Sequence, residues 1–280
     1  MNEDKTTTIG VSNGASNGVK SLWIFLGGAA LIVLALSGVA YFVAKGGSGS
    51  VATSTPSTTN NASPTQQAPH YTITQLPTTS IRDIMPDLKH EVIFSASVPE
   101  AARKVILDKV LPAQKRLDAD PMRADDWYDL ASWYHSANDF AAAADVWVFL
   151  TKVIPTDTTA YDNLGKLYYL SLKDFPKSES YFKQSIKINP DSFVPYYELS
   201  QLYTYSYKID TTAAVDILET AAVRFPQNPD PYTLIGIYWR DHANPTKARD
   251  AFLKAMDRAR TAGDVGQINA IGDELAKLPQ

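Results

Sequence analysis

The sequence predicts an all-helical domain of about four consecutive helix pairs, and three observations support this. First, a stripe of aromatic, apolar, small and aromatic residues recurs four times at i, i+3, i+4 and i+7, which marks one face of a 3.6-residue helix. Second, a small, large, small triplet follows each stripe. Third, a proline follows three of the four triplets at a constant distance. These motifs lie between residues 127 and 255.

The N-terminal part predicts a membrane anchor. Residues 1–20 form a short tail, and residues 21–44 predict one transmembrane helix. Between Lys20 and Lys45 lie 24 residues without a charge, which as a helix span about 36 Å. A cleavable signal peptide is the alternative, but its apolar region is normally about 7 to 15 residues long. The longer segment favours an uncleaved signal anchor.

The distribution of lysines predicts the orientation of this anchor. Lys5, Lys20 and the amino terminus precede the span, whereas Lys45 follows it. The positive-inside rule therefore favours a cytoplasmic N-terminus and an extracytoplasmic repeat domain. The sequence predicts a single-pass membrane protein.

Residues 45–81 predict a flexible, disordered linker. The segment is dominated by Ser, Thr, Pro and Gly and has no charged side chain from 46 to 81. Such a composition buries too little apolar surface to offset its ordering entropy. As a coil of 36 residues it has a mean reach of about 30 to 36 Å.

Residues 82–121 predict N-terminal flanking helices. Val98–Asp118 is read as one helix or as a kinked pair that packs on the first repeat. Residues 82–97 are ambiguous, since the run His90–Ala96, HEVIFSA, is compatible with a short strand.

The repeated stripes define four first helices. Their members are Trp127/Leu130/Ala131/Tyr134, Tyr161/Leu164/Gly165/Tyr168, Tyr196/Leu199/Ser200/Tyr203 and Tyr232/Ile235/Gly236/Trp239. The second helices carry the triplets Ala143/Trp147/Leu150, Ser178/Phe182/Ser185, Ala214/Leu218/Ala221 and Ala248/Phe252/Ala255. Small residues let paired helices approach closely around one large side chain.

The spacing within the units is regular. Pro121, Pro155, Pro190 and Pro226 each precede the next leading aromatic by six residues. Twelve residues separate the first small residue of a triplet from its closing proline, and proline stops a helix because it disfavours helical geometry in the residue before it. Only the distance from leading aromatic to small residue varies, at 16, 17, 18 and 16. The extra residues are therefore expected in the turn between the two helices of the second and third units.

These motifs resemble the tetratricopeptide repeat (TPR), a helix-turn-helix unit of about 34 residues. The resemblance implies a helical-hairpin solenoid with repeats at 122–157, 158–192, 193–228 and 229–260. In the last repeat, Arg260 replaces the expected proline. Residues 261–280 predict a C-terminal capping helix, with Gly263 ending the previous helix and Asp264 and Gln267 spaced as a capping box.

The resemblance also implies a peptide-binding groove lined by the first helix of each repeat. In this chain the corresponding positions hold Tyr128, Ser132, His135, Lys166, Tyr169, Tyr197, Gln201, Tyr205, Ile237, Arg240 and Asp241. Tyrosines offer contact area at low entropic cost, and Lys166 and Arg240 are suited to a carboxylate of the partner. For any one of these residues, a role in packing is the alternative.

The carboxylate clamp of chaperone-binding TPR domains does not transfer to this chain. Asn163 matches one clamp position, but Tyr128, Val194 and Glu198 stand where the clamp requires Lys or Arg. Recognition of an acidic C-terminal tail by that mechanism is therefore not expected.

Composition excludes other classes of function. Residues 81–280 carry 23 basic and 28 acidic side chains, so no basic patch for nucleic acid is expected. The chain has no cysteine, and its four histidines, His70, His90, His135 and His242, are far apart. No catalytic residue, metal site or cofactor is expected.

The sequence therefore favours a membrane-anchored interaction module that captures a peptide segment of a partner protein during assembly or quality control of envelope proteins. The alternative is a structural component that self-associates or bridges a cell-envelope complex. A homo-oligomer is compatible with the sequence but not indicated by it.

Overall fold

The computed structural model describes residue 73 and residues 80–279. Every element of regular structure in this part of the chain is a helix, which confirms the all-helical prediction there. The expected transmembrane helix at 21–44 and nearly all of the linker lie outside the described residues. Among the described helices, none combines the length and apolar character needed to cross a membrane.

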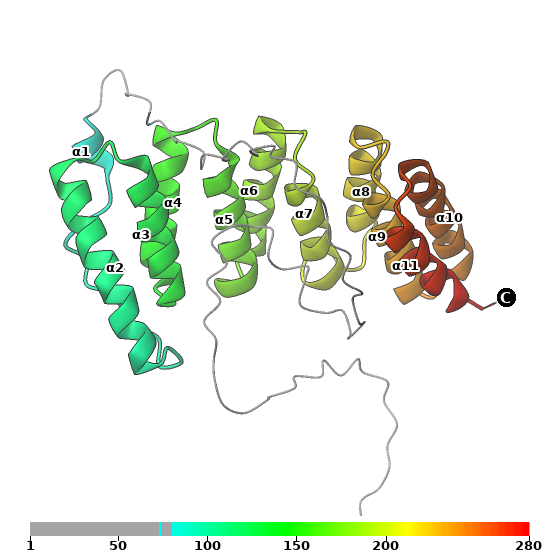
Figure 1. The fold of residues 1–280 in the computed structure, drawn as a ribbon, viewed down its shortest axis with the longest axis horizontal. Coiled ribbons are helices and arrows are strands. Elements are labelled where there is room, and N and C mark those ends of the chain that lie inside the picture. Colours follow the sequence, from blue (N-terminus) through cyan, green and yellow to red (C-terminus); the bar gives the residue numbers. More distant parts are fainter. Residues whose placement is uncertain (1–72, 74–79, 280) are drawn as a thin grey trace, which may run out of the picture. The chain divides into compact units, whose positions relative to one another are not determined.

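From α2 onward, the helices follow one another along the chain with connections of at most seven residues (Figure 1). Their bounds are α1 (Ile81–Ile84), α2 (Glu100–Ala119), α3 (Ala124–Ser136), α4 (Phe140–Val153), α5 (Thr158–Lys166), η2 (Leu167–Ser171), α6 (Phe175–Ile188), α7 (Val194–Tyr205), α8 (Ala213–Arg224), α9 (Asp230–Asp241), α10 (Pro245–Ala262) and α11 (Val265–Ala276). The element η2 is a π-helical turn that continues α5.

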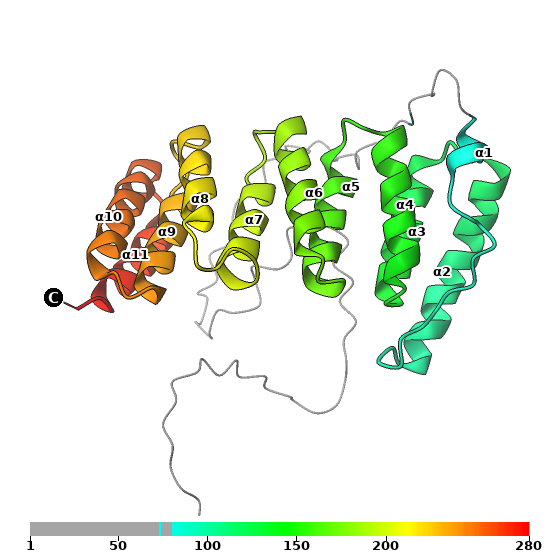
Figure 2. The same cartoon turned by 180° about the vertical axis from the view of Figure 1, so that it is seen from behind.

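Four helix pairs form the body of this region: α3 with α4, α5 and η2 with α6, α7 with α8, and α9 with α10. Each pair packs against the pair before it and the pair after it, and the same order is seen from both sides (Figures 1 and 2). Within the pairs, the close contacts depend on small residues. A Cβ added to Gly165 would lie 2.5 Å from the Phe182 ring, and one added to Gly236 would lie 2.5 Å from the Phe252 ring.

The N-terminal flank consists of the short helix α1, a loop and the long helix α2. Helix α2 runs without interruption through Pro112, so the region 98–118 is not a kinked pair of helices. Residues 85–99 contain no strand, and the segment His90–Ala96 is a loop held against the first helix pair. The Asp139 carboxylate lies 2.7 Å from Nε2 of His90 and accepts a hydrogen bond of 2.9 Å from the backbone N–H of Ile93.

The closing prolines end their helices as expected. Helices α4, α6 and α8 stop two residues before Pro155, Pro190 and Pro226. Helix α10 has Arg260 instead of proline and continues to Ala262, where Gly263 ends it at φ 69°. The missing proline therefore lengthens the last helix of the fourth pair.

The expected capping helix is present as α11, but its capping box is only half formed. The Asp264 carboxylate accepts a 3.0 Å hydrogen bond from the backbone N–H of Gln267 and thereby caps the helix. The Gln267 side chain does not return this bond to Asp264. It donates instead to the Asp230 carboxylate at 2.8 Å, which joins α11 to the start of α9.

The extra residues of the second and third pairs are accommodated in different ways. In the third pair they extend the connection between α7 and α8, as expected. In the second pair the prediction is wrong: α6 starts after three connecting residues, as α4 and α10 do, and the extra residue is taken up by η2. A π-helical turn absorbs one residue because its hydrogen bonds span five residues instead of four.

A carboxylate on α6 helps to hold the long connection between α7 and α8, to which the Tyr238 hydroxyl also donates, at the Thr211 carbonyl, over 3.0 Å. Glu179 Oε1 accepts hydrogen bonds from the Tyr203 hydroxyl at 2.6 Å and from Lys208 Nζ at 2.7 Å. Lys183, one turn later on α6, donates to the same oxygen at 2.6 Å. Although burial opposes it, these three hydrogen bonds lower the pKa of Glu179 to about 2.

Candidate functional site

The helices fall into two rows, defined here by their place in each pair. The first-helix row consists of α3, α5 with η2, α7 and α9, and the second-helix row consists of α4, α6, α8 and α10. Side chains connect neighbours within the first-helix row. The Tyr169 hydroxyl donates to the Gln201 carbonyl at 3.4 Å, and Lys166 Nζ lies 3.2 Å from Glu198 Oε1. The expected groove residues belong to this row.

Two of the expected groove tyrosines are buried. Tyr128 is 8% exposed and donates its hydroxyl proton to the carboxylate of Asp157, at the start of α5. Tyr169 is 9% exposed and lies edge-on to the Phe175 ring at 6.4 Å. Their side chains mainly join neighbouring repeats and offer a partner little area.

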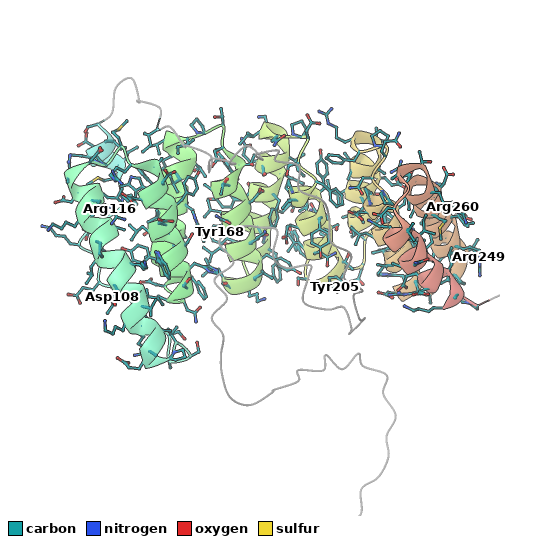
Figure 3. The ribbon with its side chains drawn as sticks, viewed as in Figure 1. Asp108, Arg116, Tyr168, Tyr205, Arg249 and Arg260 are labelled. Atoms are coloured by element: carbon teal, nitrogen blue, oxygen red, sulfur yellow. The ribbon has the colours of Figure 1, made fainter. Side chains whose placement is uncertain are left out.

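Tyr197 and Tyr205 offer the larger aromatic surface. Tyr197 is 39% exposed and Tyr205 is 59% exposed, and both lie on α7. Figure 3 labels Tyr205 at the end of that helix. Gln201, which is half-buried, lies between them in the sequence. The three residues follow one another at intervals of four and therefore lie along one face of the helix. This face of α7 is therefore the most accessible part of the expected groove.

The two polar groove positions of α3, Ser132 and His135, are both exposed. The Ser132 hydroxyl donates to the Tyr128 carbonyl at 2.8 Å, within its own helix. The His135 ring lies 5.5 Å from the Phe140 ring and 5.8 Å from the Trp147 ring, centroid to centroid. These neighbouring rings partly remove water from the imidazole and thereby lower the pKa of His135.

The two basic groove residues are already paired within the chain. Lys166 contacts Glu198 of the next repeat, as noted above. Arg240 donates to the Glu274 carboxylate on α11 and to Asp241 at 2.8 Å. Ile237 packs against the same C-terminal cluster as Ile268 on α11. Helix α11 therefore covers the part of α9 that was expected to line the groove.

Leu170 is an exposed apolar residue that is not among the groove residues expected from the sequence. It lies in η2 and is 57% exposed. The π-helical turn rotates the side chains after it relative to an uninterrupted α-helix, and such turns are frequent at functional sites. The segment LYYLS carries no glycine or proline that would signal the turn, so residue types alone do not reveal it.

Asp162 is the second residue of interest that the sequence reasoning passed over. It occupies the place in α5 that Tyr128 has in α3 and Tyr197 has in α7, so the repeat alignment itself points to it. Its Oδ1 is buried and lies near the hydroxyl of Ser185 on α6. Burial raises the pKa of Asp162 to about 6, against the opposing effects of Ser185 and of the positive charge of Lys166.

The two helix rows differ in charge. The first-helix row carries seven carboxylates and two basic side chains, a net charge of −5. The second-helix row carries six carboxylates and ten basic side chains, a net charge of +4. The basic residues are thus concentrated in the second-helix row, whereas the acidic residues are divided almost evenly between the two rows.

A small cavity of about 260 Å³ lies between α2 and α3, away from the expected groove. Asp108 and Arg116, labelled in Figure 3, line it together with Lys109, Pro112, Ala113, Asp129 and Trp133. None of the groove residues contributes to this cavity. No group of three or more His, Asp or Glu side chains in the described region is placed to hold a metal ion.

Comparison with known proteins gives likenesses of fold only. No protein-family model and no curated protein matches the sequence. Among solved structures, MamA aligns with a TM-score of 0.46 and 19% identity, covering 61% of this chain and 99% of its own. YrrB, described as a TPR protein with an unusual peptide-binding site, aligns at 0.44 and 15% identity over 62% of this chain and 86% of its own. TTC0263, a thermophilic TPR protein of Thermus thermophilus, aligns at 0.40 and 14% identity over 63% and 96%.

Proposed function

We propose that this chain is a membrane-anchored TPR protein that captures a peptide segment of a partner protein on its first-helix row. The N-terminus lies in the cytoplasm, one helix at 21–44 crosses the membrane, and the linker holds the repeats on the other side. The task that fits this arrangement is assembly or quality control of envelope proteins.

The observation that carries the proposal is the accessible face formed by η2 and α7. Large side chains are exposed on neighbouring first helices at Leu170, Tyr197 and Tyr205. Their exposure is notable because a helix pair can bury residues of this kind. Exposed aromatic anchors next to half-buried polar groups are typical of surfaces that bind a peptide. An extended segment or an amphipathic helix is the kind of ligand that fits a row of helices.

Photo-crosslinking tests where the partner binds. We would place p-benzoylphenylalanine at Tyr205 in the full-length protein and irradiate it in its native membrane. The matched control is the same residue at Leu253, which is 53% exposed but lies on α10 in the second-helix row. A discrete adduct with another protein at position 205 and none at position 253 is expected. Equal labelling at both positions, or none at either, would contradict the proposal.

The same experiment separates capture from self-association. An adduct at position 205 that contains only this chain would favour the structural alternative, a component that assembles with copies of itself. An adduct with a second protein favours capture.

Thiol labelling tests the orientation, because the natural chain has no cysteine. Val265 is 66% exposed at the start of α11, so Val265→Cys provides one reactive group. A membrane-impermeant maleimide added to intact cells is expected to label this variant. Labelling only after lysis would place the repeats in the cytoplasm and reject the proposed orientation.

A further inference from the structure

The cavity between α2 and α3 lies outside the expected groove and has walls of mixed character. Its lining residues recur at helical spacing on both helices, so one face of each helix forms a wall. Trp133 and Pro112 contribute rings with apolar area. The volume of about 260 Å³ is below the range of about 300 to 1,000 Å³ that is usual for pockets with drug-sized ligands. A ligand for this cavity is therefore small.

Two of the four charged side chains that line the cavity are paired within the chain. Arg116 donates to both oxygens of the Asp126 carboxylate, from Nη2 at 2.7 Å and from Nε at 3.0 Å. The Asp108 carboxylate accepts a hydrogen bond of 2.8 Å from Nζ of Lys104, one turn earlier on α2. A ligand that relied on Arg116 or Asp108 would have to compete with an existing pair.

Asp129 and Lys109 are the other two charged side chains, and neither makes a hydrogen bond or an ion pair with any residue that the structure describes. Partial burial raises the pKa of Asp129, as do the negative charges of Asp126 and Asp125, whereas Arg116 and Lys109 act in the opposite direction. Lys109 thus acts on Asp129 from the other helix without contacting it. An ammonium group beside Asp129 would offset the repulsion from the neighbouring carboxylates.

The cavity also has a backbone acceptor and a side-chain donor to offer. Pro112 has no N–H, so the carbonyl oxygen of Asp108 lacks the donor that a helix normally supplies four residues later. The indole N–H of Trp133 makes no hydrogen bond with a residue in the described part of the chain. Acceptors and donors therefore occur together around one small space.

Unpaired charges of opposite sign on the two walls favour a ligand that carries both signs. A simple cation would meet Asp129 but would be repelled by Lys109 and Arg116, and a simple anion would meet Lys109 but would be repelled by Asp129. A ligand with an ammonium and a carboxylate group satisfies both charges through charge-assisted hydrogen bonds.

We infer that the cavity between α2 and α3 binds a small zwitterion of the α-amino-acid class. Its ammonium group meets Asp129, its carboxylate meets Lys109, and an aromatic or aliphatic side chain packs against Trp133 and Pro112. The inference does not depend on peptide capture, because no residue of the expected groove lines this cavity.

Three probes that differ in one charged group test the inference. L-Phenylalanine carries both charges, phenethylamine lacks the carboxylate, and 3-phenylpropionate lacks the ammonium group. Binding to the full-length protein in detergent micelles is measured by isothermal titration calorimetry. We expect L-phenylalanine to bind about tenfold more tightly than either analogue, because each analogue leaves one charged side chain without its partner. No measurable binding of L-phenylalanine, or equally tight binding of either analogue, would overturn the inference.

Charge variants place the ligand in the cavity. Asp129 and Lys109 are both exposed, so Asp129→Asn and Lys109→Gln should keep the fold, and each should weaken binding of L-phenylalanine about tenfold. Asp129→Asn should not weaken binding of 3-phenylpropionate, which has no ammonium group. The controls are Asp118→Asn and Lys115→Gln, at exposed positions of α2 outside the cavity, and they should change nothing. Equal losses in the variants and in their controls would overturn the inference, because they would show that the ligand binds elsewhere.

Discussion

Gly165 shows how a single missing side chain sets the distance between two helices. The Phe182 ring occupies the space in which a Cβ of residue 165 would stand. In the third pair the corresponding residues are Ser200 and Leu218, so a larger residue on the first helix coincides with a non-aromatic one on the second. The two positions are therefore coupled by volume.

Gly165→Ala should lower the free energy of unfolding by about 1 to 3 kcal/mol, because the added methyl group overpacks the contact with Phe182. Phe182→Leu, which reproduces the third pair, should recover part of this loss when combined with Gly165→Ala. Urea unfolding of the two single variants and the double variant measures the coupling. Strictly additive losses would show that the two side chains do not compete for the same space.

Asp162 gives a stability change with a defined pH dependence. Its folded pKa of about 6 lies above the usual value of 3.8, so the folded state binds the proton more tightly than the unfolded state does. The wild-type protein therefore loses stability as the pH rises from about 4 to 6. At pH 7.5, Asp162→Asn should raise the free energy of unfolding by about 1 to 3 kcal/mol.

Below about pH 4 the advantage of Asp162→Asn should vanish, because the carboxyl is then protonated in both states. Asp250→Asn, at an exposed position of α10, serves as the control and should show no such profile. Chemical unfolding at several pH values measures both variants. A gain that does not depend on pH would mean that the charge of Asp162 is not the cause.

At the scale of elements, Glu179 ties α6 to the end of α7 and to the long connection that follows. The folded pKa of about 2 lies below the usual value of 4.5, so this stabilisation is present above about pH 4.5 and is lost as the pH falls towards 2. At pH 7, Glu179→Gln should lower the free energy of unfolding by about 1 to 2 kcal/mol, because it weakens three charge-assisted or short hydrogen bonds.

Hydrogen exchange locates the effect of Glu179→Gln. Amides at 206–212 and in the last turn of α7 should exchange faster, while α3 and α4 keep their protection. The exposed-acid variant Glu219→Gln should leave both regions unchanged. Uniformly faster exchange throughout the described helices would argue against a local tie.

The turns between paired helices share a left-handed residue. Asn138, Lys173, Lys208 and Ala243 have φ values of 61°, 57°, 62° and 53°. Asparagine tolerates this conformation, whereas alanine is strained in it by about 1 kcal/mol or more. Ala243→Gly should therefore raise the free energy of unfolding by roughly 0.5 to 1 kcal/mol.

The same Ala→Gly substitution within a helix should change the free energy of unfolding in the opposite direction. Ala270 is exposed in the middle of α11, and Ala270→Gly should destabilise by about 0.5 to 1 kcal/mol. Thermal unfolding of the two variants side by side checks both signs. A destabilised Ala243→Gly variant would show that the turn does not store this strain.

Residue types were sufficient to predict most element ends. Proline stops α4, α6 and α8, Gly263 stops α10, and Asp264 starts α11. These ends could be predicted because each of these residues acts directly on the backbone next to it. The π-helical turn η2 could not be predicted in this way, since its hydrogen-bond shift requires no special residue and depends on how α5 packs against α6.

The candidate site was less predictable than the fold, because it depends on contacts between repeats. The alignment identified the face of the first helices and the exposed Tyr197 and Tyr205. It could not show that Lys166 reaches Glu198 or that α11 covers Arg240. Both contacts join residues more than 30 positions apart, so they cannot be inferred from the residues of a single repeat.

At the scale of the whole described region, stability is shared between neighbours. Each helix packs mainly on the helices next to it in the chain, so an end of the array depends on its terminal helix. Ile271 and Leu278 are buried against α10 and α9. Ending the chain after Gly263 should therefore lower the free energy of unfolding by about 3 kcal/mol or more.

The loss should remain near the C-terminal end. Hydrogen exchange of the shortened chain is expected to lose protection in α9 and α10 and to keep it in α3 and α4. Val265→Ala, at an exposed position of α11, is the matched control and should leave exchange unchanged. Equal loss of protection in all four pairs would show that the array unfolds as one cooperative unit.

The separation of charge between the helix rows gives the array an electric dipole moment across its pairs. The net charge of −4 predicts retention on an anion exchanger alone. A row with a net charge of +4 can also hold the protein on a cation exchanger near neutral pH, at low ionic strength. The molecule should thus bind resins of either sign, each through a different side.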